Sequence, residues 1–233
     1  MRQGLLICSI LLLLFSLGCT TTTAVVHSSQ EIDFARQAVL ELIAQSVQSP
    51  PVFELAFGEL VPSEASLSLQ RFDQVPGLRY LVDRYTVLMN QVVQQVSAQL
   101  PQFIKSEVLS DLEIEDPFSI VEGPLDSTTR FFAAQASLVI EQWATEHITS
   151  AAQPEALNVW DQLVDLIITF DRAYPFLYNE ADPPVPFALS ADPVKTAVVS
   201  LLRHLFANMS KQEALLRSMA PAYDNPLITF WAR

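Results

Sequence analysis

Long segments with helical hydrophobic periodicity, separated by short breaks that contain proline, make up most of the chain. Apolar residues recur every three or four positions in residues 31–48 and 78–100, and again in the segments that follow Asp126, Pro154 and Asp192. This spacing places them on one face of an α-helix, whereas a half-buried strand needs alternation at every second residue, which the chain does not sustain. We therefore predict an all-α fold, a single multi-helix, bundle-like domain.

Each periodic segment also predicts which side chains face the core. Residues 53–61 fit either a helical turn or a strand-like crossing, and Pro101 either kinks a helix or begins a new turn. Tyr174–Leu189, with four prolines and several apolar residues, reads as a loop pinned to the body, and we expect Phe230 and Trp231 to pack against the body as well.

The residues predicted to share apolar helix faces are Ile32, Ala35, Val39, Leu42, Ile43 and Val47; Leu78, Leu81, Val82, Tyr85, Leu88, Met89, Val92 and Val96; Phe132, Ala136, Val139, Trp143 and His147; Val159, Trp160, Leu163, Leu166, Ile167 and Phe170; and Val194, Val198, Leu201, Leu202, Leu205 and Met209.

The first nineteen residues have a different pattern. Arg2 precedes an apolar run from Leu5 to Leu17, and Gly18 and Cys19 close it. A basic start, a short apolar run and a small residue before the cleavage site are typical of a secretory signal peptide. The run is shorter than the roughly 20 apolar residues that a membrane-spanning helix needs.

The end of this segment, Phe15–Cys19, resembles the lipobox of bacterial lipoproteins. The resemblance implies cleavage after Gly18 and attachment of lipid, palmitate among the acyl chains, to Cys19. Residues 1–18 would then be the signal peptide, residues 19–30 a lipidated cysteine and flexible tether, and residues 31–233 the helical domain. An ordinary cleaved signal with an incidental cysteine is the alternative.

The residue after the cysteine bears on location within the cell envelope. Thr20 stands where many lipoproteins retained in the inner membrane have Asp. By resemblance we therefore favour a lipid anchor in the outer membrane facing the periplasm, with an inner-membrane anchor or a soluble periplasmic form as alternatives. The eleven residues Thr20–Gln30 would reach at most roughly 40 Å when extended.

Composition narrows the classes of partner and chemistry. The chain has 26 acidic and 13 basic residues, and loss of Arg2 with the signal changes its formal net charge from −13 to −14. Such a charge disfavours binding to nucleic acid or to an anionic lipid surface. The two cysteines are Cys8, inside the predicted signal, and Cys19. The predicted mature domain therefore has no thiol for an internal disulfide, a metal thiolate or a nucleophile.

A second resemblance involves the centre of the chain. The motif consists of Leu112–Asp116, Ile120–Gly123, Asp126, Thr128–Thr129 and Phe131–Phe132. It resembles the central motif of the domain-of-unknown-function family 4197, exported bacterial proteins that are often lipoproteins. Pro117 and Pro124 stand where that motif usually has Ala and Gly. The resemblance implies a fold and an envelope location but no chemistry, because the family has no assigned activity.

An acidic cluster in the same region has two interpretations. Asp111, Glu113, Glu115 and Asp116 offer the oxygen ligands that Ca²⁺ prefers. The glycine-containing spacing of a calcium loop is missing, however. We favour the interpretation that Asp116 caps a helix beginning at Pro117 and that Glu113 and Glu115 are solvated.

Two further positions have both a functional and a structural interpretation. Asp126 with Thr128 and Thr129 fits an anion site at a helix start, but an acidic cap there makes simple capping the preferred interpretation. His147, in the row of Trp143, has no HExxH partner, so we favour a core or border histidine over a base or metal ligand.

These observations leave two functional hypotheses, with an enzyme a distant third. The preferred one is a non-catalytic helical domain, anchored through Cys19, that binds another protein or lipid of the bacterial cell envelope. The alternative is a carrier of an apolar ligand or lipid, suggested by fourteen phenylalanines and three tryptophans. We expect no cofactor, metal or catalytic residue. If an enzyme were present, Glu115, Asp126 and His147 would be the residues to test.

Overall fold

The computed structural model describes residues 27–48, 54–70, 72, 74–173 and 192–232. No strand occurs within this described part of the chain, so the all-α prediction is confirmed. None of the described helices is both long enough and apolar enough to cross a membrane. The α-helices are α2 (Ser29–Ser46), α3 (Phe57–Leu60), α4 (Ser63–Gln70), α5 (Leu78–Phe103), α6 (Pro117–Val121), α7 (Ser127–Ala152), α8 (Ala156–Ala173), α10 (Pro193–Met219) and α11 (Pro226–Thr229).

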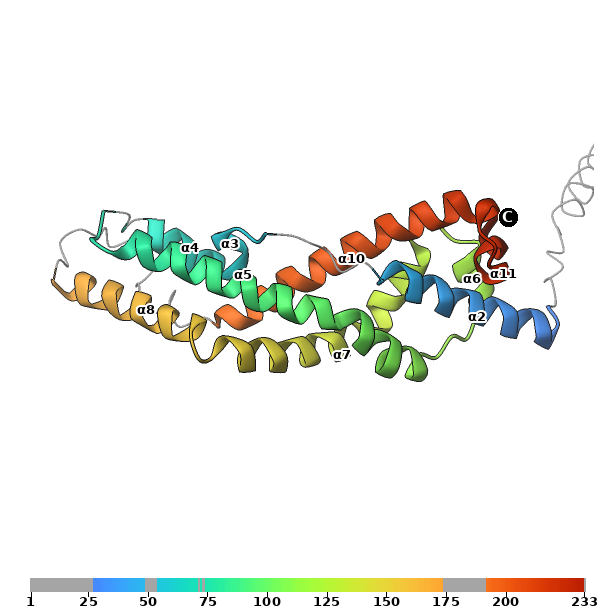
Figure 1. Ribbon diagram of the computed structural model, residues 1–233, viewed down its shortest axis with the longest axis horizontal. Coiled ribbons are helices and arrows are strands. Elements are labelled where there is room, and N and C mark those ends of the chain that lie inside the picture. The colour runs from blue at the N-terminus through green and yellow to red at the C-terminus, as the bar shows by residue number, and fades with distance from the viewer. Residues whose placement is uncertain (1–26, 49–53, 71, 73, 174–191, 233) are drawn as a thin grey trace, which may run out of the picture.

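The helices form an elongated bundle in which α7 and α10 connect two ends (Figure 1). At one end α5 packs against α8 and α3, with α4 beside α3. At the other end α2 contacts α6, α11 and α10. We call this second end the α2–α11 end.

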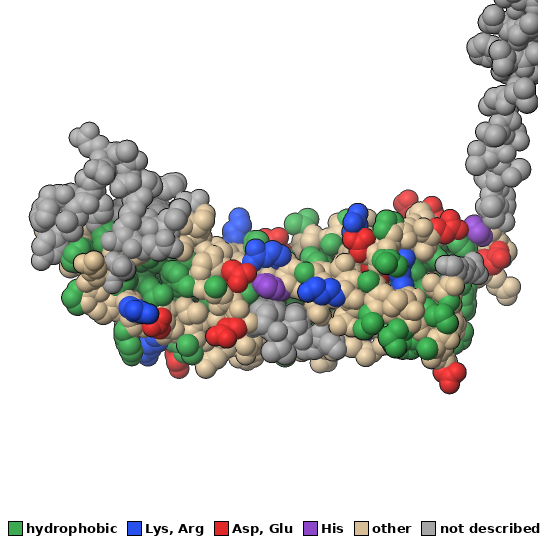
Figure 2. Space-filling model, turned by 90° about the horizontal axis from the view of Figure 1, so that it is seen from above, with side chains coloured by type: hydrophobic (Ala, Val, Ile, Leu, Met, Phe, Trp, Pro, Cys, Tyr) green, Lys and Arg blue, Asp and Glu red, His purple; other side chains and the backbone are tan. Residues whose placement is uncertain are grey.

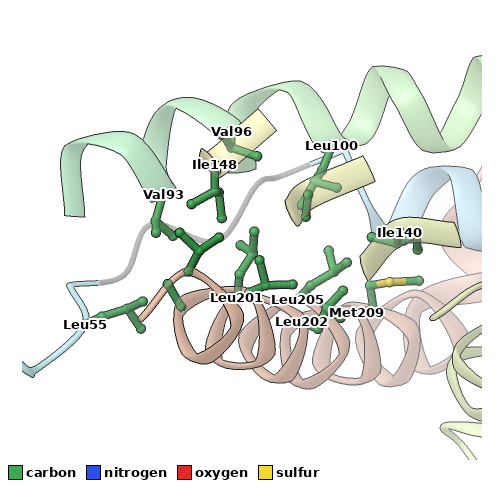
Figure 3. Packing of buried hydrophobic residues seen from close by; sticks show 14 of the residues in the cluster. Leu55, Val93, Val96, Leu100, Ile140, Ile148, Leu201, Leu202, Leu205 and Met209 are labelled. Carbon is green, nitrogen blue, oxygen red and sulfur yellow. The ribbon is translucent and has the colours of Figure 1, made fainter. Parts of the chain in front are cut away.

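The core between the ends is built from aliphatic side chains of α5, α7 and α10 (Figure 3). Burying one such side chain stabilises the fold by about 1.5–3 kcal/mol relative to leaving it in water. Residues with at most 3% of their surface exposed include Val93, Val96 and Leu100 from α5, Ile140 and Ile148 from α7, and Leu201, Leu205 and Met209 from α10.

Helix starts follow the local sequence. The Ser28 side chain accepts a hydrogen bond from the Glu31 N–H, and the Glu31 carboxylate accepts one from the Ser28 N–H at 2.8 Å. This reciprocal cap starts α2 at Ser29, whereas the sequence pattern placed the start of the helix at Glu31. The Asp116 cap is confirmed, because its carboxylate accepts from the Ser119 N–H and Pro117 is the first helical residue.

The predicted apolar face of α7 was partly wrong. Beyond Ala136, the predicted row through Val139 lies on a flank of the helix, and 54% of Val139 is exposed. Trp143 is only half-buried and stacks on Phe103 of α5, with ring centroids 4.6 Å apart. Steps of three and of four residues both keep side chains on one helix face, but α7 is buried along residues spaced four apart, so the predicted step from Ala136 to Val139 left the buried row. The row that the structure buries continues through Ile140, Ala144, Ile148 and Ala152.

The remaining sequence ambiguities have definite outcomes. Residues 57–60 of the uncertain segment form the short helix α3, and α5 continues past Pro101 to Phe103 before a π-helical turn at Ile104–Val108. Trp231 is 6% exposed, so its predicted docking is confirmed. The predicted loop Tyr174–Leu189 lies outside the described residues.

Candidate ligand-binding site at the α6–α7 turn

A buried carboxylate lies at the start of α7. Glu213 of α10 has no exposed surface. Its oxygens accept hydrogen bonds from the backbone N–H of Thr128 at 3.0 Å and of Thr129 at 2.8 Å, and from the Thr129 hydroxyl at 2.7 Å. N–H groups in the first turn of a helix have no partner within the helix and attract negative charge. Glu213 therefore caps α7 from another helix.

Arg217, one turn further along α10, balances this carboxylate. Its Nη2 lies 2.9 Å from Oε1 of Glu213, and the two side chains are 6% and 0% exposed. Burial lowers the pKa of Arg217 from its ordinary value, while the carboxylate of Glu213 opposes that shift. A buried pair of this kind replaces the lost hydration only when further hydrogen bonds satisfy both partners.

Most of these further bonds come from the turn between α6 and α7. Arg217 Nη1 donates to the Gly123 carbonyl at 3.2 Å, and Nη2 donates to the Ile120 carbonyl and, at 2.6 Å, to the Ser127 hydroxyl. A Cβ added to Gly123 would lie 2.8 Å from the Cβ of Ser127, so the turn is too tight for a larger residue. Arg217 thus fixes the α6–α7 turn against α10.

Two donors at this site have no acceptor among the described residues. They are Nε of Arg217 and Nε1 of Trp231. The Arg217 guanidinium carbon lies 4.2 Å from the centroid of the Trp231 ring, which is a cation–π arrangement. Leaving a buried donor unsatisfied costs about 1–3 kcal/mol, so two such donors on side chains in contact indicate a candidate binding site.

A hollow of about 620 Å³ adjoins this pair of donors. Its lining is mixed: Phe118, Leu125, Pro221 and Trp231 supply apolar surface, and Arg217, Glu122 and Ser218 supply polar groups. We call it the Trp231 hollow. A second hollow, of about 660 Å³, is lined by Ser28, Gln30, Glu31, Phe34, Phe118 and Phe230. Both hollows lie at the α2–α11 end and share Phe118.

The structure corrects the sequence prediction for Asp126. Asp126 precedes α7, but its side chain makes no capping hydrogen bond and instead pairs with Arg130 at 2.8 Å. The start of α7 does hold an anion at Thr128 and Thr129, and that anion is the protein's own Glu213. The sequence did contain a signal for this ion pair. Glu213 and Arg217 lie four residues apart on the face of α10 that is otherwise apolar.

The other predicted positions have simpler roles. Glu113 and Glu115 are exposed, as expected for solvated carboxylates. His147 is half-buried, with Nδ1 2.8 Å from the Trp143 carbonyl oxygen and its ring stacked on Trp143, which confirms a border position. The described residues contain no group of three or more His, Cys, Asp or Glu side chains suited to a metal ion. Cys19 and the predicted cleavage site after Gly18 lie outside them.

The chain matches no protein-family model, no curated protein and no solved structure. The resemblance to family 4197 therefore stays a prediction from the sequence motif.

Proposed function

We propose that this chain is a bacterial lipoprotein whose helical domain has a non-catalytic role, binding another component of the cell envelope close to the membrane. The observation that carries the binding role is the surface of the α2–α11 end. Its exposed large apolar side chains include Phe34, Leu125, Leu215, Met219 and Tyr223, which are between 37% and 60% exposed. Figure 2 shows apolar side chains on the surface at this end of the molecule, as well as at the opposite end.

The predicted anchor would be attached close to this surface, because the chain enters the domain through α2. The cap of α2, Ser28, follows Cys19 by nine residues, which span at most about 30 Å when extended. A lipid on Cys19 would hold the α2–α11 end within that distance of the bilayer. An apolar surface rimmed by polar residues is typical of an interaction site.

The anchor is tested by growing producing cells with radiolabelled palmitate. The wild-type chain should be labelled, and Cys19→Ser should remain unlabelled and be processed differently. Cys8→Ser is the matched control, because it removes the other cysteine and should keep the label. A wild-type band without label would refute the anchor.

The binding role is tested with a photo-crosslinking amino acid placed at Leu125 in living cells. Val87 of α5 is the matched control, since it is an aliphatic residue of similar exposure, 56% against 60%, outside the α2–α11 end. We expect a defined crosslinked product from Leu125 alone, weakened by Cys19→Ser. Equal products from both positions, or none, would contradict the proposal.

The carrier alternative is suggested by the aromatic content of the chain and by the predicted loop Tyr174–Leu189, which lies outside the described residues. Native mass spectrometry of the chain tests it, because a carrier should retain a lipid and a solid bundle should not.

A further inference from the structure

The Trp231 hollow has a donor pattern that a plain surface hollow lacks. Arg217 and Trp231 both line it, both are more than nine-tenths buried, and each has one buried nitrogen atom without an acceptor in the described part of the chain. We propose that this hollow binds a small apolar molecule through an uncharged carbonyl oxygen of the amide or ester type. The inference rests on the binding role proposed for this end, and it does not depend on lipid attachment.

The two buried nitrogen atoms without an acceptor can be satisfied by one carbonyl oxygen. The other nitrogens of Arg217 already have acceptors: Nη1 donates to Gly123, and Nη2 contacts Glu213 and Ser127. Nε is the one nitrogen of Arg217 without any acceptor in the described part of the chain, and the guanidinium carbon lies 4.2 Å from the centroid of the Trp231 ring, which carries the other unsatisfied donor, Nε1. A carbonyl oxygen has two lone pairs, so a single oxygen can accept from both donors.

Local charge favours an uncharged acceptor over a carboxylate. Arg217 is already paired with Glu213 at 2.9 Å, and Glu122 adds a further negative charge to the lining. Asp126 also acts on Arg217 and is itself paired with Arg130. A ligand carboxylate would lose its hydration without gaining an uncompensated cation, whereas a carbonyl needs only the two donors.

Binding requires a small movement of Trp231, because both donor atoms are buried. Trp231 lies in the single 3₁₀ turn Phe230–Ala232, which follows the single turn of α11. Segments this short are stabilised mainly by their packing and can shift without unfolding the bundle. The apolar body of the ligand would then contact Phe118, Leu125 and Pro221.

The experiment uses fluorine NMR of the full chain in phosphatidylcholine nanodiscs, with 5-fluorotryptophan in place of its three tryptophans. Trp231→Phe assigns the signal of residue 231. Hexanamide is the probe and hexanoate the charged comparison of the same length. We expect hexanamide to shift the Trp231 signal saturably, with Trp143 and Trp160 unmoved, and hexanoate to bind at least tenfold more weakly.

Two variants separate ligand binding from structural effects. Trp231→Phe keeps a ring in the hollow but removes the N–H, and ligand-observed NMR should then show at least a tenfold loss of hexanamide affinity. Leu125→Trp fills the hollow from an exposed position and should also block hexanamide, while leaving the fold intact by circular dichroism.

Several results would overturn the inference. These are equal shifts of all three tryptophan signals, equal binding of hexanoate, or unchanged affinity in Trp231→Phe. Failure here is distinguishable from failure of the proposed function. Crosslinking at Leu125 without hexanamide binding would support the macromolecular partner and refute the small-molecule site. Hexanamide binding without crosslinking would support the small-molecule site and refute the macromolecular partner.

Discussion

Replacing Glu213 by alanine tests the central claim that a carboxylate from α10 caps α7. The substitution leaves the Arg217 cation buried without its counter-ion and removes the acceptor of two backbone N–H groups in α7. Breaking a buried ion pair by removing one partner costs about 3–5 kcal/mol. For a domain of this size, that loss lowers the melting temperature by roughly 6–20 °C.

The assay is urea unfolding followed by far-ultraviolet circular dichroism, with Asp126→Ala as the control. Asp126 is the acid next to α7 in sequence, but it makes no capping bond, its ion pair is with exposed Arg130, and its effect on the pKa of Arg217 is smaller than that of Glu213. Its loss should cost less than about 1 kcal/mol. A double variant, Glu213→Leu with Arg217→Met, should recover part of the loss, because it no longer leaves a charge unpaired.

The outcome that refutes this reasoning is a reversed order. If Asp126→Ala destabilised the protein as much as Glu213→Ala, the cap would be local. If the double variant lost the sum of its two single losses, the two side chains would not be coupled.

Three further predictions follow from single contacts. Gly123→Ala should destabilise the protein by about 1–3 kcal/mol, because the new Cβ would lie 2.8 Å from another Cβ; an unchanged urea midpoint would show that the turn adapts. Asn90→Ala should destabilise the protein because the buried N–H and carbonyl of Leu55, which bond to the Asn90 amide at 2.8 and 2.9 Å, would lose their partners, at about 1–3 kcal/mol for each group left unpaired. Asn90→Asp should not restore this stability, because the new carboxylate oxygen would face the Leu55 carbonyl without a hydrogen to donate; full stability of either variant in urea would contradict this. Burial raises the pKa of Glu59, but hydrogen bonds from His204 and the backbone outweigh it, so the folded pKa lies below the ordinary 4.5. Glu59 therefore adds stability above pH 4.5 that is lost as pH falls through its folded pKa, and Glu59→Gln should flatten the melting temperature between pH 4.5 and lower values; an unchanged acid slope would count against this role.

Much of the fold was predictable because it depends on short-range patterns. The inward faces of α2, α8 and α10 follow from residues three and four apart, and the residues predicted there are buried or half-buried. The starts of α6 and α10 follow from Asp–Pro pairs, in which Asp116 and Asp192 accept bonds from N–H groups two or three residues away. The face of α7 was harder, since Trp143 and Val139 are apolar yet lie on its flank.

The candidate site, by contrast, depends on contacts between residues that are far apart in the sequence. Glu213 reaches N–H groups 84 and 85 residues earlier in the chain, and Arg217 reaches carbonyls in the same turn. The sequence by itself determined that α7 needs its first N–H groups satisfied, and it offered Asp126 as the nearest acid. Only the packing of α10 across α7 decided that Glu213 supplies the charge, because a buried carboxylate is stable where helix N–H groups and a cation converge, and their convergence is a property of the assembled bundle.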